Sequence, residues 1–230
     1  MPELVLALDL PRAADALRLL DRLPVLRWVK VGSILMTREG PELVRLLVGR
    51  GLKVFLDLKW HDIPHTVAGA VAAARDLGVS MATVHTLGGT TMLEAAVVAA
   101  GNELALVGVT ALTSHDPAAY ARTLGRSEVD LPQEVERLAL IGSMAGLRGI
   151  VCSPQEVSLL RRRFGPGPYI VVPGIRRRTD ILGDQVRVAT AKDAANNGAT
   201  HLVVGRPVLQ APDPAAALEE FMKEARCTAS

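Results

Sequence analysis

The feature that most constrains the fold is a recurrence of short apolar runs along the whole chain. These runs predict eight β-strands, at Leu4–Leu10, Trp28–Gly32, Lys53–Lys59, Met81–Thr86, Leu104–Thr110, Gly149–Ser153, Tyr169–Gly174 and His201–Arg206. Between them, apolar residues recur at three- and four-residue spacing, which predicts helices such as Pro41–Val48, His65–Leu77 and Gln133–Ala145. Almost continuously apolar strands that alternate with helices indicate a parallel sheet buried on both faces.

Eight strand–helix repeats within 230 residues predict an α/β protein with a closed (β/α)8 TIM barrel. An open doubly wound sheet is the alternative, and it would carry a glycine-rich phosphate turn after the first strand. Asp9-Leu10-Pro11-Arg12 stands there instead. Because the sequence shows no linker or low-complexity tract, we expect one domain over residues 1–230.

Composition argues against several classes of partner. The net charge is +2 without a long basic tract, and aromatic residues make up 3%, so nucleic-acid binding is not expected. Membrane contact is not expected either, because no apolar run is long enough to span a bilayer and the N-terminus lacks a signal-peptide core. Cys152 and Cys227 are too few for a disulfide framework, which favours a cytoplasmic location.

The stretch Asp57-Leu58-Lys59-Trp60-His61-Asp62 is the most informative about function. In a strand, residues i and i+2 share a face, so we expect Asp57 and Lys59 to point the same way. Asp62 follows just past the strand end, so two acids would bracket one ammonium. Such a cluster is costly to desolvate, which is typical of a catalytic site. A structural ion pair at a strand end would give the same pattern.

Lysine is rare in this chain, yet Lys30 and Lys59 lie among apolar strand residues. A desolvated lysine can release a proton near neutral pH and an arginine cannot, so both are candidates for a proton donor or a compact charge. The alternative is an ordinary strand lysine. Other predicted strands also carry polar residues at their ends, namely Asp9, His85, Thr86, Thr110, Ser153 and Arg206, and we expect the acids and amines of the first three strands to converge above the barrel.

A phosphate site is predicted at the ends of the last two strands. Gly205 and Arg206 end the eighth strand, and Gly174 and Arg176 follow the seventh. Barrels commonly bind phosphate at this place, through backbone N–H groups and a short helix start. Arg177, the next residue, is expected to be a solvated surface charge.

Taken together, these segments resemble the orotidine 5'-phosphate decarboxylase family over nearly the whole chain. The block Phe55–Thr66 is close to the family signature, with Trp60 where many relatives carry Phe. Further blocks agree in order: Leu6-Ala7-Leu8-Asp9, Val29-Lys30-Val31-Gly32, Leu112-Thr113-Ser114, Pro173-Gly174-Ile175-Arg176, Gly183-Asp184-Gln185 and Val204-Gly205-Arg206-Pro207. The resemblance implies decarboxylation of orotidine 5'-monophosphate to uridine 5'-monophosphate in pyrimidine synthesis. It also implies a homodimer with two shared sites and no metal or other cofactor.

The resemblance further implies roles for single residues. Lys59 would protonate C6 as carbon dioxide leaves, Asp57 would lie against the substrate carboxylate, and Lys30 would join their charge network. Asp62, with Ile63 and Thr66, would reach into the neighbouring subunit's site. The remaining implied contacts are Asp9 and Lys30 with the ribose hydroxyls, Thr113 and Ser114 with the pyrimidine, and Gln185, Gly205 and Arg206 with the phosphate; Arg176 begins a segment that resembles the family's closing lid.

Two other functions would fit parts of the same sequence pattern. A magnesium-dependent phosphorylated-sugar decarboxylase or aldolase of the same barrel group shares the Asp-x-Lys-x-x-Asp motif. It needs a Glu ligand on the second strand, where this chain has Lys30, whose ammonium would repel the cation. A non-catalytic barrel that binds nucleotide phosphate is the second alternative, but it has no need for two amines at costly buried positions.

Overall fold

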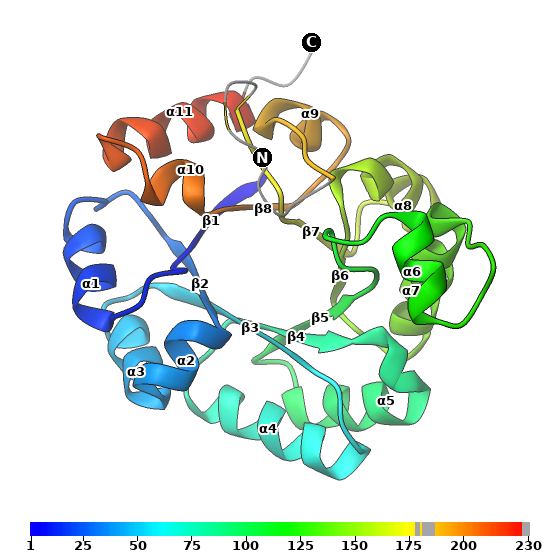
Figure 1. Cartoon of the computed structure of the whole chain (residues 1–230). Coiled ribbons are helices and arrows are strands. Elements are labelled where there is room, and N and C mark those ends of the chain that lie inside the picture. Colours follow the sequence, from blue (N-terminus) through cyan, green and yellow to red (C-terminus); the bar gives the residue numbers. More distant parts are fainter. Residues whose placement is uncertain (178–179, 181–186, 227–230) are drawn as a thin grey trace.

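The computed structural model describes residues 1–177, 180 and 187–226. It forms a closed barrel of parallel strands in the order β1 to β8, and β8 pairs with β1. The helices lie in a ring around the strands (Figure 1). The predicted (β/α)8 barrel is therefore confirmed.

All eight predicted strands are present, within shorter limits at most of their C-terminal ends. Their bounds are β1 Glu3–Ala7, β2 Trp28–Gly32, β3 Lys53–Trp60, β4 Met81–His85, β5 Ala105–Val109, β6 Gly149–Val151, β7 Tyr169–Val172 and β8 His201–Val204. Asp9, for example, lies two residues beyond β1 rather than within it. An apolar run shows where a buried segment lies, but the pairing with the neighbouring strands decides where the strand ends.

The helices fill the connections between strands. Their bounds are α1 Ala13–Asp21, α2 Ser33–Glu39, α3 Pro41–Gly49, α4 Pro64–Asp76, α5 Gly89–Ala100, α6 Pro117–Thr123, α7 Leu131–Met144, α8 Val157–Phe164, α9 Ala191–Asn196, α10 Arg206–Leu209 and α11 Pro214–Arg226, with 3₁₀ turns η1 Thr86–Gly88 and η2 Pro154–Glu156. The three helices expected from periodicity correspond to α3, α4 and α7. Proline begins α3 and α4, and Asp130 caps α7 by accepting from the Gln133 N–H at 3.1 Å. Among the described residues, no helix has the length and apolar character needed to cross a membrane.

Alternation along the strands divides the apolar core into two layers. One layer lies between the sheet and the helices, and the other fills the barrel interior. The interior layer consists of Val5, Ala7, Trp28, Phe55, Met81, Val107, Val171 and Val203. At the starts of the strands the His201 ring packs edge-on against Trp28 at 5.2 Å and Tyr169 at 4.9 Å between centroids. The interior is thus packed near the strand starts, which leaves room for a site toward the strand ends.

Candidate active site

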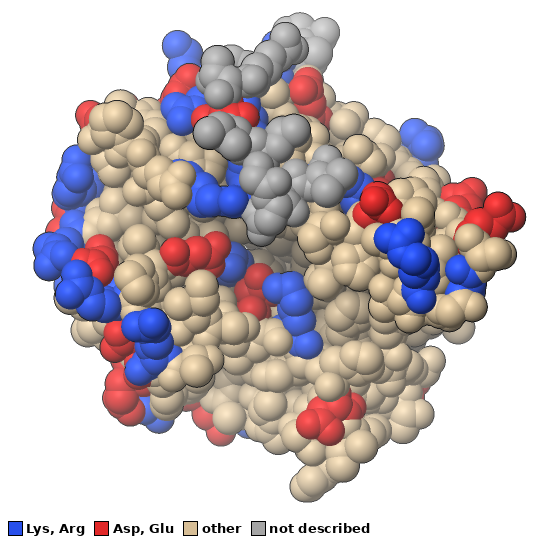
Figure 2. Space-filling view, in the orientation of Figure 1, with Lys and Arg blue, Asp and Glu red and all other residues tan. Residues whose placement is uncertain are grey.

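A cavity of about 470 Å³ opens at the C-terminal ends of the strands. Figure 2 shows acidic and basic side chains around a hollow over the middle of the barrel. Its polar lining consists of Asp9, Lys30, Asp57, Lys59, Thr113, Arg176, Arg206 and Gln210. Small-molecule sites have volumes of about 300–1,000 Å³. This cavity falls within that range and is large enough for a ligand of roughly nucleotide size.

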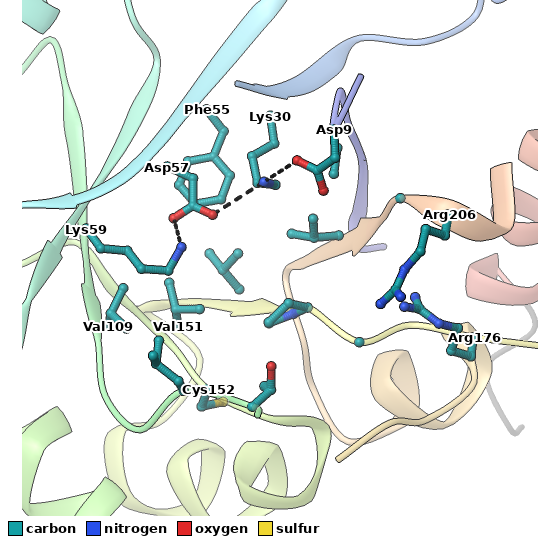
Figure 3. Close-up of a pocket in the computed structure, with 18 of the residues that line it drawn as sticks. Asp9, Lys30, Phe55, Asp57, Lys59, Val109, Val151, Cys152, Arg176 and Arg206 are labelled. Carbon is teal, nitrogen blue, oxygen red and sulfur yellow. Dashed lines mark hydrogen bonds and ion pairs between the residues drawn. The ribbon is translucent and has the colours of Figure 1, made fainter. Parts of the chain in front are cut away.

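Acids and amines alternate along one wall of the cavity (Figure 3). Lys30 Nζ lies 3.1 Å from Asp9 Oδ1 and 3.5 Å from Asp57 Oδ2. Lys59 Nζ donates to Asp57 Oδ1 at 2.9 Å. The expectation that these four side chains converge from the first three strands is confirmed. We call Asp9, Lys30, Asp57 and Lys59 the charged row.

Asp57 is the centre of this row, and its side chain is 14% exposed. Burial by itself raises the pKa of the Asp57 carboxyl, but the positive charges of Lys30 and Lys59 outweigh it, together with hydrogen bonds from Lys59 and Thr83. The pKa of Asp57 therefore lies below its ordinary value, and the group is an anion at neutral pH. One carboxylate holds two ammonium groups that would otherwise repel each other.

Lys59 owes its position to an irregularity in β3. Leu56 pairs with Ala82 and Trp60 with Val84, so β3 advances four residues while β4 advances two. Within this stretch Lys59 has φ 52°, and among the described residues it is the one non-glycine with a positive φ. A left-handed lysine inside a strand costs on the order of 1–3 kcal/mol, and such strain is concentrated at functional sites. Sequence periodicity could not have predicted it.

The opposite end of the cavity is basic. Arg176 and Arg206 extend from the ends of β7 and β8, and Figure 3 shows their guanidinium groups close together, away from Lys59. Arg176 is 5% exposed, and its backbone N–H donates to the Ala189 carbonyl at 2.9 Å. Gly174 allows the chain to turn here, because its φ is 80°. The predicted cluster of glycines and arginines at this end is therefore present.

Apolar side chains also line the cavity. They include Phe55, Val109, Val151 and Cys152. Burial raises the pKa of the Cys152 thiol above its usual range, so this cysteine stays protonated and is not a nucleophile. These apolar side chains offer no polar group to compete with Asp57 for the Lys59 ammonium, whose side chain is 39% exposed.

Several predicted site residues lie elsewhere. In the part of the chain that the structure describes, Asp62, Ile63, Thr66 and Ser114 are exposed and lie outside the cavity lining. The Asp62 carboxylate accepts from the Ile63 N–H at 2.7 Å. The expectation that two acids bracket Lys59 is therefore wrong within one chain, because the chain turns outward toward α4 after Trp60. It is Lys30 that lies between two acids. Gln185 lies outside the described residues.

Arg177 was expected to be solvated, and that prediction is wrong. Its guanidinium pairs with Asp180 at 3.1 Å and Glu220 at 3.0 Å and lies over the Phe221 ring. Charge composition alone cannot show such pairing, because Glu220 is 43 residues away in sequence.

Some lining residues were not predicted from the sequence. Gln210 follows α10 and carries no recognisable motif, whereas Phe55 could have been found because it lies two residues before Asp57 on the same strand. Within the described residues, no group of three His, Cys, Asp or Glu side chains is arranged to hold a metal ion.

The fold and the cavity define a class: a (β/α)8 barrel enzyme with alternating acids and amines at the strand ends and a basic pocket opposite them. The chain belongs to the orotidine 5'-phosphate decarboxylase / HUMPS family, whose model matches residues 2–221.

Individual relatives agree with this assignment. A protein of Halorhodospira halophila named orotidine 5'-phosphate decarboxylase is 52% identical over 228 residues, covering 97% of this chain and 95% of that protein. One of the same name from Alkalilimnicola ehrlichii is 48% identical over 225 residues, covering 96% of this chain and 95% of that protein. The crystal structure of orotidine 5'-phosphate decarboxylase from Lactobacillus acidophilus superposes with a TM-score of 0.87 at 33% identity, covering 99% of this chain and 100% of that chain.

Proposed function

We propose that this enzyme decarboxylates orotidine 5'-monophosphate to uridine 5'-monophosphate in pyrimidine synthesis. Its family and the names of its relatives support this activity. The observation that carries the proposal is the charged row, in which the Asp57 carboxylate lies between the ammonium groups of Lys30 and Lys59 inside a cavity with a basic far end.

In the proposed reaction, the bond between C6 of the pyrimidine and its carboxylate carbon breaks. The electron pair stays on C6 as carbon dioxide leaves, and a proton of the Lys59 ammonium then binds C6. Lys59 recovers its proton from solvent. Because the pyrimidine offers no electron sink for this carbanion, fixed positive charge next to C6 is the main source of stabilisation.

The charged row supplies that charge in a preorganised form. Asp57 pairs with the Lys59 ammonium at 2.9 Å and so holds the amine in place for the transfer. We place Asp57 against the substrate carboxylate, where two like charges repel until carbon dioxide departs. Asp9 and Lys30, at 3.1 Å from each other, would hold the ribose hydroxyls and fix the sugar relative to Lys59.

Phosphate would bind at the basic end, through Gly205, Arg206 and Gln185. Because the phosphate is remote from C6, its binding energy can order the site without taking part in bond breaking. Arg176 would begin the closing segment over the phosphate. Thr113 and Ser114, after β5, would contact the pyrimidine.

We further propose a homodimer in which Asp62, Ile63 and Thr66 complete the neighbouring subunit's site. Their exposure supports this: all three are exposed, and the large apolar side chain of Ile63 is 66% exposed. With Asp62 supplied from the partner, Lys59 would have an acid on each side.

The activity is tested by following the ultraviolet absorbance of orotidine 5'-monophosphate with the purified protein. Steady turnover is expected with and without a chelator. Activity that the chelator abolishes would favour the magnesium-dependent alternative, and tight binding without turnover would favour a non-catalytic barrel. The cytoplasmic location and the single domain over residues 1–230 stay predictions.

The shared site has a test of its own, by mixing two inactive variants. Lys59→Ala and Asp62→Ala subunits, dissociated and reassociated together, form mixed dimers with one intact site. Recovery of about a quarter of the wild-type rate per subunit is expected from random pairing. No recovery, with mixed dimers shown to be present, contradicts the proposed contribution of Asp62.

A further inference from the structure

Thr83 lies inside the barrel next to the charged row. β4 places Met81 in the interior layer and Ala82 and Val84 in the outer layer, so the alternation turns Thr83 toward the interior. Its side chain is fully buried. A buried hydroxyl at this depth needs hydrogen-bond partners.

The partners of this hydroxyl are the two neighbours in the charged row. Thr83 Oγ accepts from the backbone N–H of Lys59 at 2.8 Å and donates to Asp57 Oδ1 at 3.1 Å. One side chain thus bonds to the main chain of the proposed proton donor and to its carboxylate partner.

The first bond bears on the backbone of Lys59. This residue lies in the stretch where β3 loses its register with β4 and has φ 52°. A strained backbone persists when its surroundings hold it. At this irregular point the Thr83 hydroxyl accepts a hydrogen bond from the backbone N–H of Lys59.

The second bond bears on the rotation of the Asp57 carboxylate. Asp57 Oδ1 accepts from Lys59 Nζ at 2.9 Å as well as from Thr83, and Oδ2 faces Lys30 at 3.5 Å. The bond from the hydroxyl to Oδ1 opposes rotation of the carboxylate. Oδ1 therefore stays with Lys59 and Oδ2 with Lys30, which keeps the order of charges along the row.

We propose that Thr83 is a positioning residue, which holds the Lys59 backbone and the Asp57 carboxylate in the arrangement that the reaction needs. This inference rests on the proposed function for its kinetic consequence. The geometry it describes stands independently of the substrate.

The test compares three variants by kinetics on orotidine 5'-monophosphate. Thr83→Val keeps the branched shape and removes the hydroxyl, and Thr83→Ser keeps the hydroxyl. Thr86→Val is the matched control, because the buried Thr86 hydroxyl donates to the Val109 carbonyl at 2.8 Å, apart from the charged row.

Thr83→Val is expected to lower kcat on the order of 10²-fold with little change in KM, the loss that a misplaced reacting group produces. Thr83→Ser should restore most of the rate. The melting temperature of Thr86→Val should fall by about as much as that of Thr83→Val, because each variant loses one buried hydroxyl. Its kcat should nevertheless remain near that of wild type. Equal kcat in the two valine variants, or a serine variant as slow as Thr83→Val, overturns the proposal.

The pH profile gives a readout that a purely structural role does not move. Asp57 is faced by Thr83 from β4, by Lys30 from β2 and by Lys59 on its own strand, with Asp9 beyond Lys30 and His85 beyond Lys59. Thr83→Val removes only the Thr83 hydroxyl from this set, and the hydrogen bond from that hydroxyl lowers the pKa of Asp57. The acid limb of kcat/KM should therefore move to higher pH in Thr83→Val and stay in place in Thr86→Val. Equal acid limbs in the two variants contradict the proposal.

If wild-type protein fails to turn over the substrate, the proposed function is refuted and the positioning claim is judged by structure. Crystal structures of wild type and Thr83→Val then decide it. A displaced Lys59 amine or an altered φ in the variant is expected, and an unchanged charged row overturns the inference.

Discussion

Two layers of the barrel interior differ sharply, although they lie on the same strands. Residues two apart share the interior face, and in β2, β3 and β4 the pairs are Trp28 and Lys30, Phe55 and Asp57, and Met81 and Thr83. The first member of each pair packs in the apolar interior, which we call the lower layer. The second member is polar and belongs to the charged row or contacts it; with the other polar residues that line the cavity it forms what we call the upper layer. One step along each strand thus changes the interior from a core to a site.

The two layers contribute differently to stability and to chemistry. The lower layer buries aromatic and aliphatic area, which contributes about 1.5–3 kcal/mol per large apolar side chain. The upper layer holds the largely buried ion pair of Lys30 and Asp57, and replacing a buried ion pair by apolar residues is often neutral or stabilising. The upper layer is therefore retained for function.

The largest effect is expected from Lys59→Met, which removes the amine and keeps an unbranched chain. Loss of the proton donor and of fixed positive charge should lower kcat by at least about 10⁴-fold. Melting temperature should change little, because Asp57 keeps Lys30 at 3.5 Å. Absorbance kinetics and a thermal melt check this. A rate within tenfold of wild type would contradict the assignment of the chemistry to the upper layer.

The next effect belongs to the lower layer. Trp28→Ala should lower the free energy of unfolding by about 3–5 kcal/mol, since a buried aromatic ring leaves a cavity. At a temperature where the variant is folded, its kcat should remain near that of wild type. Denaturant titration measures the stability, with Trp28→Phe as the milder control. A large loss of kcat in the folded variant would show that the layers are coupled.

His201 makes the lower layer sensitive to acid. Burial, and then the nearby Lys53, lower the pKa of His201 from 6.5 to about 4. The folded state therefore favours neutral histidine, and its contribution is complete above pH 6.5 and is lost as pH falls toward 4. The loss amounts to about 3 kcal/mol at most.

Stability measured at several pH values in wild type and His201→Phe isolates this contribution. The variant should show a shallower decline of stability between pH 6.5 and 4, because it lacks the His201 imidazole. His85, whose pKa is also lowered to about 4, is present in both proteins and so does not contribute to the difference. Equal slopes contradict the assignment to His201.

The smallest effect concerns the basic end of the upper layer. Arg206→Ala should lower kcat/KM for orotidine 5'-monophosphate by about 10- to 100-fold, the loss of one charged hydrogen bond. Activity on orotidine, which lacks the phosphate, should be unchanged. Arg177→Ala is the control, since that guanidinium is held by Asp180 and Glu220. Equal losses on both substrates would place Arg206 outside the phosphate site.

Much of this arrangement was predictable from the sequence, and the reasons are local. Apolar runs fixed the number and order of the strands, and period two placed Asp57 on the face of Phe55. The identity of the residues at strand ends predicted the charged row and the basic end, because all strand ends of a parallel barrel meet on one face.

What escaped prediction depends on contacts between distant segments. The left-handed φ of Lys59 arises from the pairing of β3 with β4, and the two bonds of Thr83 follow from that pairing. Asp62 lies two residues beyond the end of β3, and the outward turn after Trp60 took it away from Lys59. Strand register and chain direction after a strand end are set by tertiary packing, which periodicity does not encode.

In the proposed reaction the Lys59 ammonium gives a proton to C6, and the reverse of this proton transfer can be measured. A group that protonates C6 must also remove the C6 proton from bound uridine 5'-monophosphate, since the forward and reverse reactions share one transition state. In heavy water, nuclear magnetic resonance should show deuterium entering C6 with wild-type protein and buffer-level exchange with Lys59→Met. Equal exchange in the two proteins, or none with wild type, would contradict the account.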